Sequence, residues 1–498
     1  MIKSNILITV LITCIIFLSS STFLSAQSEL MFGVNAEILD KHLINVFNDS
    51  SKNYKEFFEN YGIKYIRYPG GIPVRYYFWD NADKISDALI LLGNYLGKRG
   101  SKQGQNYESK ADRFKLDSDN YMIFLNFCNR SGLIPVIQIN TLFYIHNNQV
   151  YQIEEFLRDR TGAQLQPDRW DKIKAYINNQ MDFTHSLIDN VIWEIGNEDA
   201  FIYKPDKYGK ICVNMVEIIK SKYPNDKVIV EMTNALSGKL LRDRWNTDFI
   251  NYLNEHNVLS KIDYFAPHFY DQSGKELTTQ EEINDRVKSG NVDEFADEII
   301  SHFPENFEPK LFYTEYAAFL TAFDNKNFNT QLHALMMLNY LMRFEANRNI
   351  VGVINQGFSN EKNGMFLPAY SISKLEYAKQ KLPKDETFAY ISPQAEAVRL
   401  FYNTKKKKLS GFFENDNILA LLTSDENGYI LQILNFSNSS STINLKEIFP
   451  EITNFNNISH YKFQNLDSHY WNPDETAVHQ ELIDLTITIN PQSFVVVN

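Results

Sequence analysis

The chain has 498 residues, of which 44% are hydrophobic and 22% are charged, so it can bury a large core as ordinary globular proteins do. Its formal net charge of −12 argues against nucleic acids and anionic membrane surfaces as partners, because both require basic patches. The one dense basic run, Lys405 to Lys408, follows a predicted helix, and we interpret it as a solvated boundary loop.

The N-terminal segment has the pattern of a cleavable signal peptide. Lys3 precedes an apolar run over residues 6–18, and small residues then lead to a plausible cleavage point after Ala26. The apolar run is too short to span a membrane comfortably. We therefore expect residues 1–26 to be removed and the protein to be secreted or periplasmic, with no membrane span in the mature chain.

Two cysteines, Cys128 and Cys212, remain after this cleavage, and both lie in predicted amphipathic helices. Such cysteines are more often packed thiols than a disulfide, and two of them cannot build a metal site. Stability must therefore come from the hydrophobic core.

Short apolar strands alternate with helical segments along residues 30–404. The predicted strands cover residues 32–37, 63–68, 133–140, 191–198, 228–233, 264–270, 311–316 and 351–358. The helical segments between them include residues 54–61, 119–129, 169–188, 207–222, 280–302 and 330–347, and residues 393–402 form the eighth. Eight strand–helix units connected by right-handed crossovers predict an α/β fold, a (β/α)₈ TIM barrel.

The pattern changes after residue 404. Short β-type runs at 409–413, 418–422, 429–434, 441–445, 485–489 and 493–497 are separated by turn-rich segments. They predict a C-terminal antiparallel β-sandwich over residues 405–498. Two long connections, 72–118 and 359–392, follow the second and eighth strands and are expected to lie over the barrel mouth.

Polar residues stand where the predicted strands end, which is where barrel enzymes carry their active sites. The candidates are Glu37, Arg67, Asn140, Asn197, Glu198, His268, Tyr270, Glu315 and Gln356. Each one alone could be an ordinary solvated residue. Together they favour a functional site on one face of the barrel.

Glu198 and Glu315 are the carboxylate pair that we expect to act on a glycosidic bond. Such cleavage needs one carboxyl group that protonates the leaving oxygen and another that is ionised. A separation of about 5–5.5 Å between the carboxyl groups would indicate retention of the anomeric configuration, and about 6.5–9.5 Å would indicate inversion.

Several motifs resemble glycoside hydrolase family 51, which holds α-L-arabinofuranosidases in the large clan A of retaining barrels. The matching stretches are Arg67-Tyr68-Pro69-Gly70-Gly71 with Val74, Tyr77 and Trp79, then 193–198 (Trp-Glu-Ile-Gly-Asn-Glu), 264–270 (Tyr-Phe-Ala-Pro-His-Phe-Tyr), Thr314-Glu315-Tyr316 and 490–495 (Asn-Pro-Gln-Ser-Phe-Val). They are scattered over most of residues 30–498. They are specific for the clan and suggest the family.

The resemblance implies a role for each matching residue. Glu198 would be the general acid/base, Glu315 the nucleophile, and Asn197 the partner of the sugar 2-hydroxyl. Arg67 and Tyr270 would keep Glu315 ionised. His268 would tune Glu198 or bind a hydroxyl. Glu37 and Gln356 match positions that contact the glycone.

Two departures from the family pattern leave the substrate open. Ile72 follows Pro-Gly-Gly where the family typically has an Asn that binds arabinofuranose, and an Ile cannot replace the hydrogen bonds of an amide. The residues around Glu315 also differ from the usual Asp-Glu-Trp. A clan A glycosidase for another glycone, a uronide or a galactan unit and possibly endo-acting, therefore stays open.

Aromatic residues in the predicted loops, Trp79 first among them, could form a floor for sugar rings. The rival from another class is a catalytically silent glycan-binding barrel, although a binder needs no acid/nucleophile pair. We expect a poly- or oligosaccharide partner and no cofactor or metal. The sequence leaves the oligomeric state undetermined.

Overall fold

The computed structural model describes residues 29–36, 43–97, 120–153, 167–233, 239–270, 292–317, 330–358, 365–367, 388, 390–452, 455–482 and 485–498. The predicted signal peptide and Glu37 lie outside these residues. None of the helices in this part of the chain combines the length and the apolar composition needed to cross a membrane.

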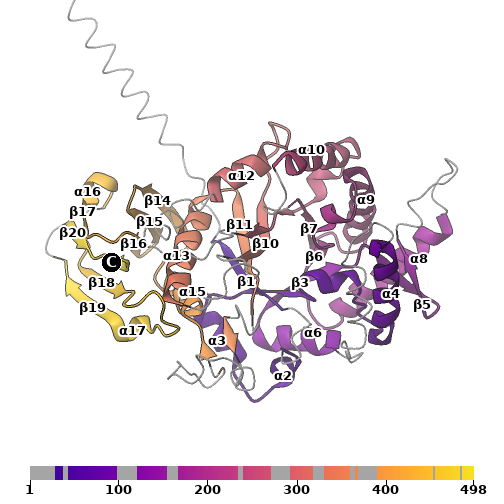
Figure 1. Ribbon diagram of the computed structural model, residues 1–498, viewed down its shortest axis with the longest axis horizontal. Coiled ribbons are helices and arrows are strands. Elements are labelled where there is room, and N and C mark those ends of the chain that lie inside the picture. Colours follow the sequence, from indigo (N-terminus) through magenta and orange to yellow (C-terminus); the bar gives the residue numbers. More distant parts are fainter. Residues whose placement is uncertain are drawn as a thin grey trace, which may run out of the picture.

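Eight parallel strands close into a barrel in the order β11–β1–β2–β3–β6–β7–β8–β10, with β10 pairing back to β11 (Figure 1). They are β1 (Met31–Asn35), β2 (Tyr65–Tyr68), β3 (Ile134–Ile139), β6 (Ile192–Ile195), β7 (Lys227–Glu231), β8 (Tyr264–Ala266), β10 (Leu311–Ala317) and β11 (Ile350–Asn355). Short β9 (Phe269–Tyr270) continues β8 and pairs with the end of β10. Each predicted strand overlaps one of these eight, which confirms the predicted (β/α)₈ barrel.

Helices surround the barrel (Figure 1). They are α2 (Leu43–Asn48), α3 (Tyr54–Asn60), α4 (Ile85–Gly97), α6 (Asn120–Ser131), α8 (Pro167–His185), α9 (Pro205–Lys222), α10 (Lys239–Glu255), α12 (Val292–Ile300), α13 (Gln331–Ala346) and α15 (Pro393–Asn403). Three short 3₁₀ segments matter for the barrel mouth or rim: η1 (Ile72–Arg75), η2 (Ala82–Lys84) and η3 (Asp199–Phe201). A hairpin of β4 (Phe143–His146) and β5 (Gln149–Gln152) follows β3. Cys128 and Cys212 are buried free thiols, as predicted.

The inside of the barrel has an apolar layer beneath a polar one. The apolar layer consists of Val136, Ile192, Ile229, Ala266, Phe312 and Ile354. Two residues further along β6 and β7, the same inward positions carry Glu194 and Glu231, because side chains of a strand alternate between its faces. The lower end is thus filled by hydrocarbon, and the charged groups collect at the C-terminal ends of the strands.

Phe312 occupies the middle of the apolar layer, where its ring centroid lies 5.9 Å from that of Tyr65 and 5.6 Å from that of Tyr264. Gly352 on the neighbouring strand leaves room for it, since a Cβ atom there would come within 2.6 Å of the Phe312 ring. The interior of the barrel is therefore filled by a large residue next to a small residue on the neighbouring strand.

The C-terminal unit contains a six-stranded antiparallel sheet, in the order β14–β15–β16–β21–β18–β19, and a separate pair, β17–β20. The strands are β14 (Lys408–Glu414), β15 (Ile418–Asp425), β16 (Gly428–Asn435), β17 (Ser441–Asn444), β18 (Asn457–Lys462), β19 (Ala477–Glu481), β20 (Thr486–Ile489) and β21 (Ser493–Val497). Short helices α16 (Leu445–Ile448) and α17 (Pro473–Thr476) connect some of them. An apolar core between the two sheets confirms the predicted β-sandwich.

Helices α13 and α15 lie between the barrel and the sandwich (Figure 1). Lys405, which follows α15, forms an ion pair of 2.6 Å with Glu345 of α13, and both side chains are almost completely buried. Its ammonium also lies 4.7 Å from the centroid of the Tyr402 ring. The interpretation of this basic run as a solvated loop is therefore wrong at Lys405, because a buried carboxylate draws the side chain inward.

Replacing Glu345 by Ala should lower the free energy of unfolding by about 3–5 kcal/mol, because the Lys405 ammonium is left buried without a counter-charge. Urea denaturation measures this change. The double variant Glu345→Leu, Lys405→Met should recover most of it. The matched control, Lys55→Ala, breaks an exposed pair with Glu59 and should change stability by less than about 1 kcal/mol. A Glu345→Ala loss as small as that of the control would contradict the role of the pair.

Candidate active site

Arg67 on β2 lies at the centre of the polar layer, where its side chain is fully buried. Its Nε and Nη2 donate to the two carboxylate oxygens of Glu194 at 2.5 and 3.0 Å, and Nη1 donates to Glu315 at 2.5 Å. Nη2 also donates to Oδ1 of Asn197 at 2.8 Å. Burial lowers the pKa of Arg67, but the carboxylates of Glu194 and Glu315 outweigh it and raise that pKa overall. The guanidinium is therefore a permanent cation that ties β2, β6 and β10 together.

Glu315 on β10 accepts a hydrogen bond at each carboxylate oxygen. Arg67 donates to Oε1, and the hydroxyl of Tyr270 on β9 donates to Oε2. Burial, followed by the carboxylates of Glu315 and Glu198, raises the pKa of Tyr270 well above its usual value, so this hydroxyl keeps its proton. These two donors, one a cation and one a neutral hydroxyl, fix the orientation of the Glu315 carboxylate.

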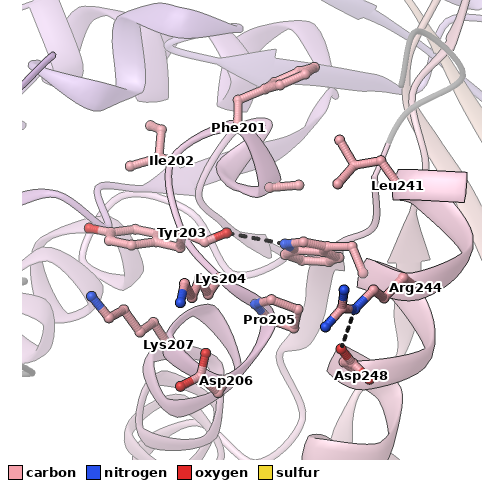
Figure 2. Close-up of a pocket in the computed structure, with 12 residues that line it drawn as sticks. Phe201, Ile202, Tyr203, Lys204, Pro205, Asp206, Lys207, Leu241, Arg244 and Asp248 are labelled. Atoms are coloured by element: carbon pink, nitrogen blue, oxygen red, sulfur yellow. Dashed lines mark hydrogen bonds and ion pairs between the residues drawn. The ribbon is translucent and has the colours of Figure 1, made fainter. Parts of the chain in front are cut away.

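The chain turns sharply after β6 and presents Glu198 to the mouth of the barrel. Gly196 has φ +87°, and a Cβ atom at this position would come within 2.2 Å of Oδ2 of Asp199. Glu198 itself is left-handed, with φ 51° and ψ 40°, a conformation that is costly for a residue other than glycine. The turn continues through η3 and Tyr203 into α9, as Figure 2 shows.

Arg75 of η1 holds this turn in place. Its Nη2 donates to the backbone oxygens of Asn197 at 2.8 Å and Glu198 at 3.3 Å. The loop after β2, which begins with the Pro-Gly-Gly motif, is thereby tied to the loop after β6. The side-chain oxygen of Asn197 already accepts from Arg67 and, at 3.2 Å, from Gln138. Asn197 can therefore serve a ligand only as a donor, through its amide N–H₂ group.

One oxygen of Glu198, one oxygen of Glu315 and a ring nitrogen of His268 all lie within 4.8 Å of one another. Nδ1 of His268 is 3.3 Å from Oε1 of Glu198 and 3.7 Å from Oε2 of Glu315. The Glu198 side chain keeps 17% of its surface exposed, against 6% for Glu315. The two carboxyl groups thus face each other beside a shared imidazole, and Glu198 is the one that solvent reaches.

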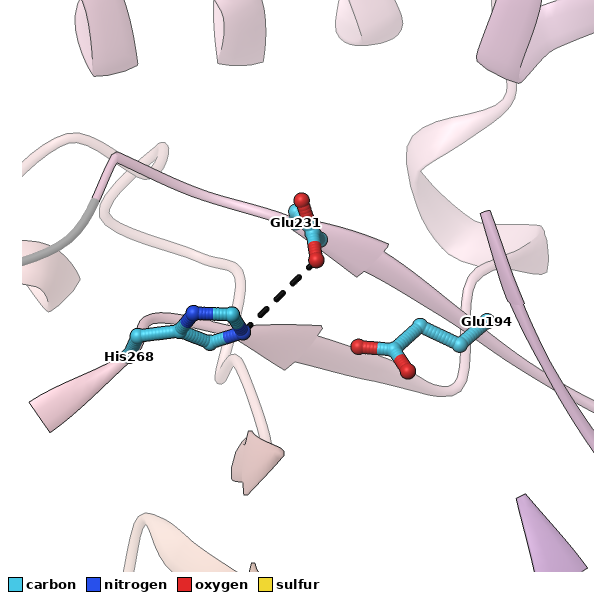
Figure 3. Close-up of side chains that lie close together, drawn as sticks. All are labelled: Glu194, Glu231 and His268. Atoms are coloured by element: carbon cyan, nitrogen blue, oxygen red, sulfur yellow. Dashed lines mark ion pairs between the residues drawn. The ribbon is translucent and has the colours of Figure 1, made fainter. Parts of the chain in front are cut away.

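A further carboxyl group, Glu231 at the end of β7, lies behind His268 (Figure 3). Oε1 of Glu231 is 3.6 Å from Nε2 of His268 and 3.7 Å from Nη2 of Arg67. This oxygen accepts no hydrogen bond from the described residues. Burial raises the pKa of Glu231 well above its usual value, the nearby Glu194 and Asp199 add to this, and Arg67 opposes it. The surroundings of Glu231 therefore favour its protonated form.

Two groups of side chains around His268 have the residue types of a metal site. One consists of Glu194, Glu231 and His268, and the other of Glu198, Glu315 and His268. In both groups the Arg67 guanidinium already pairs with a carboxylate. A metal ion would have to compete with this fixed positive charge, so these donors fit a buried arginine better than a divalent cation.

The remaining predicted site residues lie as follows. Asn140 accepts backbone hydrogen bonds from Leu142 and Phe143 and donates to the Tyr77 backbone oxygen at 3.3 Å, so it shapes the loop after β3. The ring of Trp79 packs among aromatic rings of α6 and α8, namely Tyr121, Tyr176 and Phe183. Gln356 directly follows β11, and its Oε1 is buried without a partner among the described residues. Their roles toward a ligand stay predictions.

The sequence reasoning missed four residues that hold the site together: Arg75, Glu194, Glu231 and Thr314. Thr314 donates to Glu194 at 2.6 Å and lies 3.3 Å from Nε2 of His268. The two glutamates carried a usable signal, because each lies two residues after an inward apolar residue of its strand. Thr314 carried the same signal, since it lies two residues after the inward Phe312, and Arg75 carried none.

Replacing Glu231 by Gln should make the stability less dependent on pH. The folded protein keeps the Glu231 proton at pH values where the unfolded chain has lost it, so this group lowers stability as pH rises above about 4.5. Burial raises the pKa of Asp199 to about 6, and that group acts in the same direction. Urea denaturation between pH 4.5 and 7.5 should show a shallower decline in Glu231→Gln, and shallower still with Asp199→Asn added. A decline equal to that of the exposed control Glu59→Gln would contradict a protonated Glu231.

No protein-family model matches the sequence, and no curated protein matches it either. Solved structures share its fold. An α-L-arabinofuranosidase from Thermotoga maritima in complex with arabinose has a TM-score of 0.61 and 14% identity, over 95% of this chain and 97% of that chain. A family 51 α-L-arabinofuranosidase from Bifidobacterium longum has a TM-score of 0.62 and 11% identity, with the same coverage. A family 44 xyloglucanase from Paenibacillus polymyxa has a TM-score of 0.55 and 12% identity, over 95% and 96% of the two chains. The chain therefore has the barrel-and-sandwich fold of these proteins.

Proposed function

We propose that the protein is a secreted glycoside hydrolase that cleaves poly- or oligosaccharides with retention of the anomeric configuration. The observation that carries this proposal is that one carboxyl oxygen of Glu198 and one of Glu315 lie within 4.8 Å of each other. This is close to the roughly 5–5.5 Å of retaining enzymes and shorter than the roughly 6.5–9.5 Å that an inverting enzyme needs for a water molecule. The solved enzymes that share the fold are themselves glycosidases.

Glu315 would be the nucleophile. Its carboxylate oxygen attacks the anomeric carbon and forms a glycosyl ester, while the bond from that carbon to the leaving oxygen breaks. Arg67 and Tyr270 donate hydrogen bonds to this carboxylate and fix its direction. Because both partners are buried and hydrogen-bonded elsewhere or to Glu315 itself, little reorganisation is needed when the ester forms.

Glu198 would be the acid/base. Its carboxyl proton goes to the leaving oxygen in the first step, and its carboxylate takes a proton from water in the second, as water attacks the anomeric carbon and frees Glu315. The greater exposure of Glu198 suits this role, since its proton must exchange with the leaving group and with water. His268, whose Nδ1 lies 3.3 Å from Glu198, would tune Glu198 or bind a sugar hydroxyl.

The sugar unit that the enzyme binds as its glycone has to be identified separately. Ile72 has 42% of its surface exposed, at the start of the loop that follows Pro-Gly-Gly. An exposed isoleucine offers packing and no hydrogen bond where an arabinofuranosidase would hold its sugar with an amide. A uronide or a galactan unit is therefore the second candidate. A structural neighbour at 12% identity and TM-score 0.53 was solved with neoagarooctaose.

Aryl glycosides test both points. The secreted protein should hydrolyse one member of a panel containing an aryl α-L-arabinofuranoside, β-D-glucuronide and β-D-galactoside, and NMR should show the product anomer retained. Glu315→Ala should abolish turnover, and Glu198→Gln should lower kcat/KM by about 10²–10⁴-fold. The exposed glutamate variant Glu481→Gln serves as the control and should match the wild type. An inverted product, or full activity in Glu315→Ala, would refute the mechanism.

A further inference from the structure

A groove of about 820 Å³ runs along the rim of the barrel between the start of α9 and the start of α10 (Figure 2). Its walls include Phe201, Ile202 and Pro205 on one side and Leu241, Arg244 and Trp245 on the other. This volume lies within the range of about 300–1,000 Å³ that is typical of ligand sites. The groove has no part in the carboxylate cluster described above.

Two large apolar side chains line this groove and are largely exposed: Phe201 at 55% and Leu241 at 60% of their surface. Exposed apolar groups gathered at one place, with a polar rim, mark an interaction site more often than scattered ones do. The rim carries Lys204 and the ion pair of Arg244 with Asp248 at 3.9 Å. An apolar face beside hydrogen-bonding groups suits a sugar chain, whose rings have C–H faces and hydroxyl edges.

The floor of the groove is rigid. Nε1 of Trp245 donates to the backbone oxygen of Tyr203 at 3.1 Å, which joins α10 to the loop before α9. The Trp245 ring packs on Phe249 and Tyr208, with centroids 5.1 and 5.8 Å away. A preformed floor saves a ligand the cost of ordering the protein.

The groove is continuous with the acid/base residue through the backbone. Phe201 follows Glu198 by three residues, and its N–H donates to the Glu198 backbone oxygen at 3.1 Å. A general acid must touch the oxygen of the leaving sugar, so the chain attached to that oxygen departs on the Glu198 side of the cleft. The lining of the groove begins at Ala200, two residues after Glu198 in the chain.

We infer that this groove binds the leaving-group portion of a polysaccharide chain, with Phe201 as the stacking platform. The inference rests on the proposed function and extends it to a substrate class: the enzyme acts on bonds that have several sugar units beyond the cleavage point. Such an enzyme prefers polymers and longer oligosaccharides to small glycosides.

The variant Phe201→Ala tests this inference, alone and combined with Leu241→Ser. The ratio of kcat/KM on soluble arabinoxylan, xyloglucan or neoagarooctaose to kcat/KM on the active aryl glycoside should fall about tenfold, through KM on the long substrate, because a lost stacking platform weakens binding of the chain. Tyr429→Ala, which removes an exposed aromatic residue from the sandwich, is the matched control and should keep the wild-type ratio. An unchanged ratio in Phe201→Ala, or equal losses on long and short substrates, would overturn the inference.

Binding separates this inference from the proposed function. Affinity electrophoresis of Glu315→Ala in the same polysaccharides should show retardation that the added Phe201→Ala change reduces. If polysaccharide binding depends on Phe201 but no glycoside is hydrolysed, the groove stands and the hydrolase proposal fails. If an aryl glycoside is hydrolysed but polysaccharide retardation ignores Phe201, the hydrolase stands and the groove assignment fails.

Discussion

The structure depends on a single buried cation, the guanidinium of Arg67, placed among the carboxyl groups of the barrel. Three glutamates have a carboxyl oxygen within 3.7 Å of it, and so many buried anions would repel one another without it. The cation divides them by role. Glu194 receives a two-pronged contact that fixes strand positions, Glu315 receives one donor that directs it at the mouth, and Glu231 lies 3.7 Å away. One residue therefore connects carboxyl groups from three different strands.

A local irregularity completes this arrangement. The pairing of β10 with β11 shifts its register between Tyr313 and Tyr316. Ordinary alternation would turn two successive side chains to opposite faces, yet Thr314 contacts Glu194 and Glu315 contacts Arg67, both inside the barrel. A bulge of this kind re-aims a side chain without moving the sheet. The register shift between β10 and β11 therefore turns the side chain of Glu315, the candidate nucleophile, toward the inside of the barrel.

The sequence predicted the parts of the fold that follow from periodicity. Eight apolar strands with polar ends marked the barrel and brought Arg67, Glu198 and Glu315 to one face. The sequence did not predict features whose burial is weak or depends on distant contacts. Strand β19 is mostly exposed, so its sequence lacks the alternation that marks a strand. Lys405 is buried only because it pairs with Glu345 of another helix. The surroundings of the loop residue Trp79 could not be predicted either, because its aromatic neighbours lie on helices far from it in the sequence. The order of residues along the chain does not show which charged residues on different strands pair with each other.

The hydrocarbon layer around Phe312 has a consequence for the order of events at the site. Because it fills the lower end of the barrel, everything that reaches the carboxylates arrives and departs through one mouth. On the proposed mechanism, the water of the second step must take the place that the departing sugar has just vacated beside Glu198. Any sugar hydroxyl still lodged there competes with that water for the glycosyl ester. On the proposed mechanism, a departing chain that stays in the groove would therefore compete with water to receive the glycosyl group.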